Sequence, residues 1–174
     1  MDFCVVPTIT FRLLNCLIFF DHQRRKIVFF NVTQYPDKEW IRQQFRNAFP
    51  YENKYKYIIR DHDKKFGHWI QGTIKVFKLI DKPIAYRSPW QNAFCERMIG
   101  TLKFELLNRV IIFNEAHLEK MIKIYLGYYH KERTHIGLSK DTPNGKLVTC
   151  SGGTYKIQSQ PQVGGLYHSY KWVA

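Results

Sequence analysis

The stretch from Leu13 to Phe20 constrains the fold most, because almost every position in it is apolar. Such a run suits a central β-strand that is covered on both faces. A shorter apolar segment, Asp2 to Val6, precedes it across a turn, and the β-branched and aromatic segment Lys26 to Val32 follows it after a polar reversal. These three segments predict an antiparallel meander at the start of a sheet.

The spacing of apolar residues changes after residue 36, where helical patterns begin to alternate with short strands. The predicted helices are 37–49, 69–80, 93–108 and 114–133, and the predicted strands are 57–59 and 83–86. Strands first, then alternating elements, then helices predict an α/β fold, with a mixed sheet of about five strands and helices on both faces.

The chain is strongly basic. Its 174 residues include 27 Lys and Arg against 14 Asp and Glu, which gives a net charge of +13. A folded chain with this charge favours a polyanionic partner, most often nucleic acid, because phosphate neutralisation releases counterions. An anionic membrane surface is the competing partner.

The cysteines and the N-terminal apolar region bear on the compartment. Asp2, Arg12 and Asp21 divide that region into runs that are too short to span a bilayer. The cysteines are scattered without a CxxC pair, so neither a zinc ribbon nor a disulfide framework is predicted. They are Cys4, Cys16, Cys95 and Cys150. We expect a cytoplasmic chain with reduced thiols, associated with the nucleoid if its partner is DNA.

Three carboxylates stand out among the few acidic residues. Asp2 lies in an apolar strand, Asp61 follows the strand at 57–59, and Glu96 lies in the first turns of the helix at 93–108. Ligand sites in α/β sheets form at the carboxyl ends of strands, and a carboxylate in an apolar strand is costly unless it is paired or metal-bound. Oxygen ligands favour Mg²⁺ or Mn²⁺, and two such ions can promote phosphodiester displacement.

Each of these acids also has a simpler interpretation. Asp2 lies one residue from the chain start and could be a solvated terminal residue. Asp61 could be a turn residue or a helix cap, since Asp favours both. Glu96 could be an ordinary surface residue beside Arg97.

The motifs around these acids resemble the catalytic core of DDE transposases and retroviral-type integrases, most closely bacterial insertion-sequence transposases with an integrase core. Asp61 and Glu96 are separated by 34 residues, close to the family spacing. The resemblance covers about residues 1–145. It rests on Asp2, on the runs 61–66, 88–97 and 129–135, and on Leu138 and Thr142-Pro143.

The resemblance implies an RNase H-like fold in which Asp2, Asp61 and Glu96 bind two Mg²⁺ or Mn²⁺ ions. Asp63 is the alternative if Asp61 is misassigned. The implied reaction is hydrolysis at the ends of a double-stranded DNA element, followed by transfer of the 3′-hydroxyl into target DNA by a homo-multimer. The alternatives are a truncated, non-catalytic DNA-binding or multimer-poisoning fragment, and a nuclease that does not join strands.

Basic and polar residues near the acids are candidates for DNA contact. Lys103 follows Glu96 by seven residues on the same predicted helix, so both face one side. Asn92 and Arg97 flank the acid and could contact phosphate or hold the loop. Arg133 and His135 match a basic motif that follows the last core helix of the family.

The expected organisation is an integrase-type core at 1–145, truncated at its N-terminus, and a small hairpin appendage at 146–174. The family usually carries several strand residues before the first acid and a separate DNA-recognition domain before the core. Here the chain begins one residue before Asp2, so we expect this acid to be weakly held.

Overall fold

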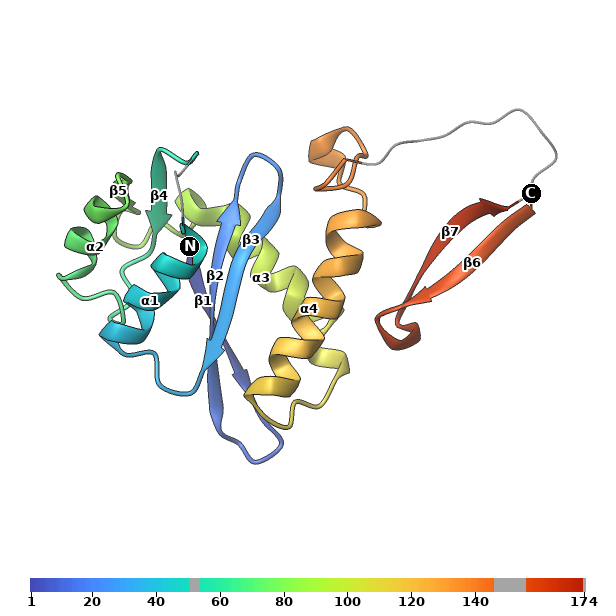
Figure 1. Ribbon diagram of the computed structural model, residues 1–174, viewed down its shortest axis with the longest axis horizontal. Helices are drawn as coiled ribbons and strands as arrows, with labels where there is room; N and C mark the ends of the chain where they lie inside the picture. The colour runs from blue at the N-terminus through green and yellow to red at the C-terminus, as the bar shows by residue number, and fades with distance from the viewer. Residues whose placement is uncertain (51–53, 146–155, 174) are drawn as a thin grey trace. The chain divides into compact units, whose positions relative to one another are not determined.

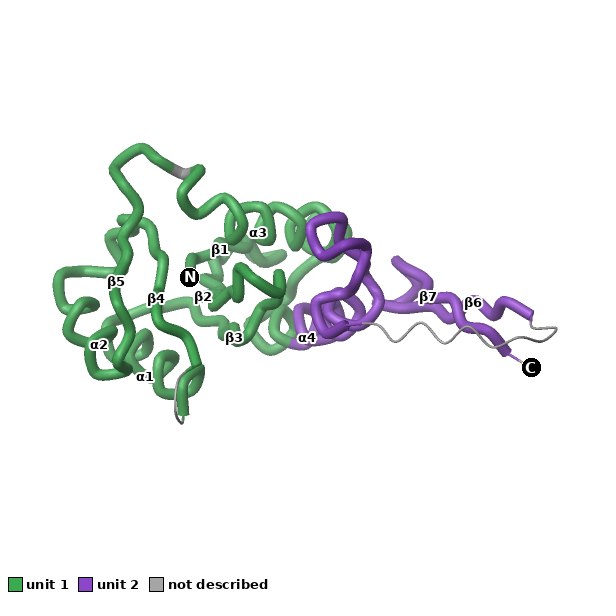
Figure 2. The backbone as a smooth tube through the Cα atoms, turned by 90° about the horizontal axis from the view of Figure 1, so that it is seen from above, with its two compact units in different colours: residues 1–119 green, residues 120–174 purple. Residues whose placement is uncertain are grey.

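The computed structural model describes residues 1–50, 54–145 and 156–173. The chain divides into two compact units, residues 1–119 and 120–174 (Figure 2). Each unit is described separately below.

The first unit begins with the antiparallel meander predicted from the sequence. Strands β1 (Asp2–Pro7), β2 (Leu13–Asp21) and β3 (Lys26–Thr33) form a three-stranded sheet in the order β1-β2-β3. Asp2 pairs with Ile18, and the Met1 ammonium donates a 2.6 Å hydrogen bond to the Ile59 carbonyl. Asp2 is therefore held by strand pairing and is not a loose chain end, contrary to the expectation from the sequence.

A second, parallel pair is formed by β4 (Tyr57–Arg60) and β5 (Ile80–Pro83). The structure does not join the two sheets into the single five-stranded sheet expected from the sequence. Strand β4 is only four residues long. It is linked to the start of β1 by the hydrogen bond from the Met1 ammonium to the Ile59 carbonyl.

The strand expected at 83–86 was placed too late in the chain, and the helix expected at 69–80 was predicted to be too long at its C-terminal end. Helix α2 (Ile70–Val76) ends where Lys78 takes a left-handed conformation, with φ at 56°. The chain then turns into β5, where the Ile80 N–H donates to the Lys56 carbonyl. Ile80 fits the helical spacing of the sequence, but this hydrogen bond places it in the sheet.

Helices cover both faces of the three-stranded sheet, as the sequence predicted. Figure 2 shows α1 (Lys38–Ala48) and α3 (Ala93–Glu105) on opposite sides of it. The Trp40 N–H donates to the Asp37 carboxylate at 2.7 Å, which caps α1. Ile41 and Phe45 of this helix are fully buried against the sheet, and with Leu17 they belong to the main core.

The second unit contains most of α4 (Glu115–Lys131) and a β-hairpin. The hairpin consists of β6 (Lys156–Gln162) and β7 (Tyr167–Val173), and the Tyr167 ring stacks on Tyr128 with centroids 4.7 Å apart. A C-terminal hairpin was expected. The boundary at residue 145 stays a prediction, since residues 146–155, with Cys150, lie outside the described residues.

The helices in the described ranges are too short or too polar to cross a bilayer.

Candidate active site

Asp2 is the most perturbed carboxylate of the site. It lies at the start of β1, and its Oδ1 accepts the Phe3 N–H at 2.7 Å. Burial, together with the negative charges of Asp61 and Glu96, raises the pKa of Asp2 from 3.8 to about 6, against the opposing effects of the Phe3 hydrogen bond and the N-terminal ammonium. Asp2 is therefore close enough to both other acids to interact with their charges.

Asp61 follows β4 directly, at the carboxyl end of that strand. Its Oδ1 accepts the Asp63 N–H at 3.1 Å, which closes a turn and orients the carboxylate. The preceding Arg60 does not neutralise this carboxylate, because its guanidinium forms a bidentate pair with Asp81 at 3.0 and 2.9 Å.

The carboxylate of the alternative acid, Asp63, forms an ion pair with a neighbouring lysine. Its carboxylate accepts the Lys65 ammonium and the Lys65 backbone N–H, each at 2.9 Å. The structure therefore favours Asp61 over Asp63 as the acid that acts on Asp2.

Glu96 lies on an exposed face of the first turn of α3, as expected from the sequence. The pKa of the neighbouring Cys95 thiol also responds to the charges of these acids. Burial, together with the charges of Asp2, Glu96 and Asp61, raises the pKa of the Cys95 thiol to about 11, whereas the N-terminal ammonium acts to lower it. The three acids thus converge on one region, where β1, β4 and α3 meet.

The carboxylates interact across this region without forming a coordination shell. Among residues 1–50, 54–145 and 156–173, no three His, Cys, Asp or Glu side chains are close enough to hold a metal ion. The donor set nevertheless fits a hard divalent cation, because all three side chains offer carboxylate oxygens. A cation would also relieve the repulsion that raises the pKa of Asp2.

The residues expected to contact DNA fall into three settings. Arg97 and Lys103 are exposed on α3, and Lys103 lies close enough to β1 to lower the pKa of Cys4, which burial raises to about 11. Asn92 is almost completely buried just before α3. Arg133 and His135 lie in the second unit, where Arg133 Nη1 is 3.4 Å from His135 Nδ1 and both side chains approach the Tyr129 ring.

Two features of the site were not found from the sequence. His62 Nε2 lies 2.7 Å from the Ile84 carbonyl, so this ring ties the loop after Asp61 to the end of β5. The Arg25 guanidinium stacks on the Phe94 ring at 3.6 Å, which ties the β2–β3 turn to the start of α3. Both contacts join residues far apart in the chain, so no local spacing signals them.

One protein-family model matches part of this chain. Residues 81–143 match the family model described as Integrase core domain, a segment that contains Glu96 but neither Asp2 nor Asp61. Among curated proteins, nothing matches the chain.

Two solved structures are similar in fold. The catalytic core domain of BIV integrase matches with a TM-score of 0.56 at 16% identity, over 82% of this chain and 89% of that chain. A chain of the simian T-cell lymphotropic virus intasome, solved with a PP2A regulatory subunit, matches with a TM-score of 0.63 at 12% identity, over 99% of this chain and 65% of that chain.

The chain has an α/β fold that is similar to the fold of retroviral integrase catalytic cores. More particularly, residues 81–143 match the integrase core domain model, and this match confirms the resemblance that the sequence motifs indicated.

Proposed function

We propose that this chain is the catalytic core of a DNA transposase or integrase, a Mg²⁺-dependent DDE polynucleotidyl transferase. The observation that supports the proposal best is that burial of Asp2 and the nearby charges of Asp61 and Glu96 together raise the pKa of Asp2 to about 6. Carboxylates that perturb one another at the end of a strand are typical of a functional site. The match to the integrase core domain supports the same reaction class.

In this proposal Asp2, Asp61 and Glu96 hold two Mg²⁺ or Mn²⁺ ions. Such ions, when bound, activate a water or hydroxyl and stabilise the leaving oxygen of an in-line displacement. The chain contributes rigid positions for the ligands. Strand pairing with Ile18 holds Asp2, and the turn to Asp63 orients Asp61.

The proposed reaction has two balanced steps. In the first, a water oxygen bonds to phosphorus at the element end, the bond from phosphorus to the 3′ oxygen breaks, and a 3′-hydroxyl is released. In the second, that hydroxyl oxygen bonds to a target phosphorus, and a target 3′ oxygen leaves with a proton. The second step replaces one phosphodiester bond by another, so no ATP is required.

The partners follow from the same proposal. Arg97, Lys103, Arg133 and His135 are proposed to contact the DNA, whereas the burial of Asn92 favours a role in holding the loop before α3. One similar structure is part of a viral intasome, which supports a homo-multimer assembled on element ends and target DNA. Such a protein would act at the nucleoid.

A DNA-joining assay tests this function. The chain is incubated with supercoiled plasmid and a labelled duplex carrying a 3′-hydroxyl, with Mg²⁺ or Mn²⁺. We expect nicking and joining by the wild type. We expect neither by Asp61→Asn or Glu96→Gln, although both variants still bind DNA. Lys38→Gln, a change on the exposed surface of α1, is the matched control and should retain activity.

The same assay separates the alternatives. If the wild type binds DNA but cuts nothing, the chain is a non-catalytic binding or multimer-poisoning fragment. If it cuts but never joins, it is a nuclease of the same fold.

A further inference from the structure

Two hydrogen bonds hold the backbone on both sides of Asp61 to one residue, Ile84. The Ile84 N–H donates to the carbonyl of Arg60, just before Asp61, at 2.9 Å. His62, just after Asp61, donates from Nε2–H to the Ile84 carbonyl at 2.7 Å, since a carbonyl oxygen can only accept. The position of Asp61 is therefore tied to the residue that follows β5.

The chain leads from Ile84 to Glu96 through a closed loop. The Ala85 N–H donates to Gln91 Oε1 at 2.7 Å, and Gln91 lies in the helical turn η1 (Pro89–Asn92) that runs into α3. Glu96 follows Gln91 by five residues, in the first turn of α3. Gln91 therefore holds the start of this helix to the residue next to Ile84.

These contacts form one path from Asp61 to Glu96, through adjacent residues of the loop. Figure 1 shows the elements that the path joins. Strands β4 and β5 lie next to each other, and α3 crosses behind the three-stranded sheet. The path therefore links the strand that carries the second acid to the helix that carries the third.

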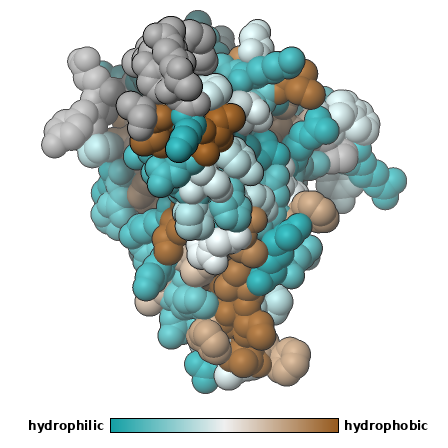
Figure 3. All heavy atoms as spheres, turned by 90° about the vertical axis from the view of Figure 1, so that its right-hand side faces the viewer, coloured by the Kyte–Doolittle hydropathy of each residue, from teal (hydrophilic) through white to brown (hydrophobic). Residues whose placement is uncertain are grey.

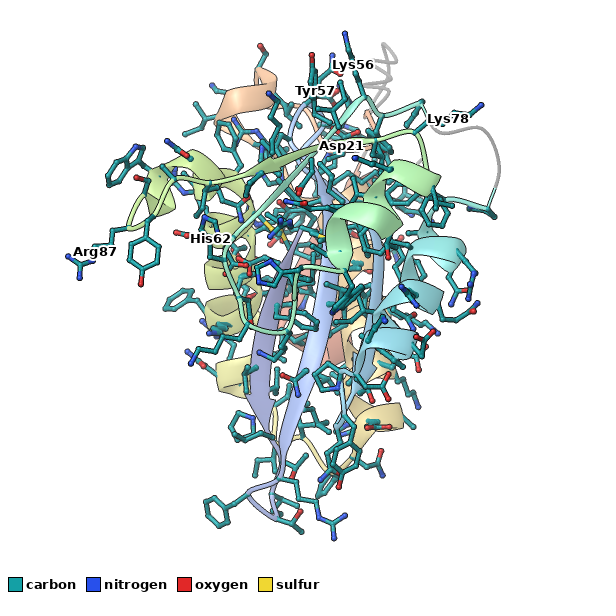
Figure 4. All side chains as sticks on the ribbon, turned by 90° about the vertical axis from the view of Figure 1, so that its left-hand side faces the viewer. Asp21, Lys56, Tyr57, His62, Lys78 and Arg87 are labelled. Carbon is teal, nitrogen blue, oxygen red and sulfur yellow. The ribbon has the colours of Figure 1, made fainter. Side chains whose placement is uncertain are left out.

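The two side chains that complete the path, His62 and Gln91, are exposed. Figure 4 shows His62 on the same side of the first unit as Arg87, whose side chain points outward. The His62 ring lies 6.2 Å from the Tyr86 ring, measured between centroids. An exposed hydrogen bond exchanges with bonds to water and adds little to the free energy of folding. The two contacts therefore affect where the acids lie more than whether the chain folds.

We propose that His62 and Gln91 are positioning residues that set the separation between Asp61 and Glu96. The inference rests on the proposed function, in which these acids bind divalent cations. Metal ligands must be held within about 0.5 Å of their productive positions, and the mutual repulsion of carboxylates opposes this in a site without a cation. Two hydrogen bonds to adjacent residues of one loop resist that repulsion, and neither side chain is itself a metal ligand.

Mn²⁺ binding to the full chain, followed by electron paramagnetic resonance of the free ion, tests the proposal. His62→Phe keeps a ring beside Tyr86 but has no N–H to donate. We expect its dissociation constant for Mn²⁺ to rise at least about tenfold, as happens when a partner of a metal ligand is removed. DNA joining should fall in parallel. His62→Gln places an amide N–H at a similar reach and should recover the affinity to within about threefold of the wild type.

Two further variants complete the set. His68→Phe makes the same substitution at another exposed histidine, outside the path from Asp61 to Glu96, and should leave the Mn²⁺ affinity unchanged. Gln91→Met removes the acceptor of the Ala85 N–H. It should weaken Mn²⁺ binding to a similar extent and speed hydrogen exchange of the Ala85 amide even without metal. Thermal melts of all four variants should agree with that of the wild type, because the contacts are exposed.

Three results would overturn the proposal. One is a His62→Phe variant that binds Mn²⁺ and joins DNA as well as the wild type. Another is an equal loss in His62→Phe and His62→Gln, which would assign the effect to the ring and not to the donated hydrogen bond. Both of these leave the proposed function standing. The third is a wild type that neither binds Mn²⁺ nor cuts DNA, in which case the proposed function fails together with this inference.

Discussion

At the scale of single residues, Asp2 carries an unfavourable charge in the absence of a cation. Burial and two neighbouring acids raise its pKa to about 6. In the unfolded chain this carboxyl group ionises near its ordinary value of 3.8, whereas in the folded chain it keeps its proton until about pH 6. The unfolded state therefore binds fewer protons between these values, and the free energy of unfolding falls as the pH rises through this window.

This difference predicts a measurable pH dependence. The shift of Asp2 should cost about 3 kcal/mol of stability between pH 4 and pH 6, with no further change above that window. Urea unfolding at several pH values should show the decline in the wild type and a smaller decline in Asp2→Asn. Mn²⁺ at pH 7 should stabilise the wild type more than the variant. Identical pH curves for the two proteins would contradict the assignment.

Asn92 is the second unusual residue. Its side chain is 1% exposed, and neither its Oδ1 nor its Nδ2 has a hydrogen-bond partner within the described part of the chain. A buried unsatisfied polar atom costs about 1–3 kcal/mol, so its presence four residues before Glu96 indicates a functional reason.

The substitution Asn92→Leu tests whether the unsatisfied amide serves function, because leucine has a similar shape without the polar atoms. We expect the free energy of unfolding to rise by about 1–3 kcal/mol, measured by chemical denaturation, while DNA cleavage falls. Asn108→Leu, at an exposed position beyond α3, is the control and should change neither quantity. Destabilisation by Asn92→Leu would show that the amide has a structural partner in solution.

At the scale of elements, β4 positions Asp61, which follows it directly. The position of β4 beside β5 depends on a buried ion pair. Arg60 at the end of β4 and Asp81 in β5 are both largely buried, and their bidentate pair fastens the two strands together. Removing one partner of such a pair leaves a buried charge without compensation.

We therefore expect Asp81→Ala to lower the free energy of unfolding by about 3–5 kcal/mol. The double variant Arg60→Met/Asp81→Leu should recover most of that loss, because neither charge then remains buried. Denaturant melts of the single and double variants measure both effects. A double variant as unstable as the single one would show that the pair itself, not the orphaned charge, stabilises β4.

Elements with local signals were predictable, and those set by distant contacts were not. The meander at residues 2–33 was predicted closely because its apolar runs are bounded by polar turns. The helix start after Asn114 was also predicted, since its side chain accepts the His117 N–H at 2.8 Å. The position of β5 was missed because Ile80 fits a helical stripe, and only pairing with β4 decides its state.

At the scale of the whole molecule, the net charge of +13 should govern affinity for DNA. The face drawn in Figure 3 is mostly hydrophilic, with apolar residues exposed in several patches. Arg97 and Lys103 lie on α3, the helix that also carries Glu96, whereas Lys38 lies on α1 at the opposite face of the sheet.

This arrangement predicts which cations contribute to binding. Arg97→Gln and Lys103→Gln should each reduce the slope of log affinity against log salt by about 0.9, because each removes one phosphate contact. Lys38→Gln should leave the slope unchanged. Fluorescence titrations with duplex DNA at four salt concentrations measure the slopes. An equal reduction by all three substitutions would mean that binding depends only on net charge.

The sequence by itself determined the class of fold, the pairing of strands in the meander and the basic charge, because local spacing and composition specify each of these. The tertiary structure decided that Asp2 is partly buried within reach of the charges of Asp61 and Glu96, that Asp63 pairs with Lys65, and that Met1, just before β1, bonds to β4. Those outcomes depend on contacts between residues tens of positions apart, and burial and charge coupling exist only once such contacts form.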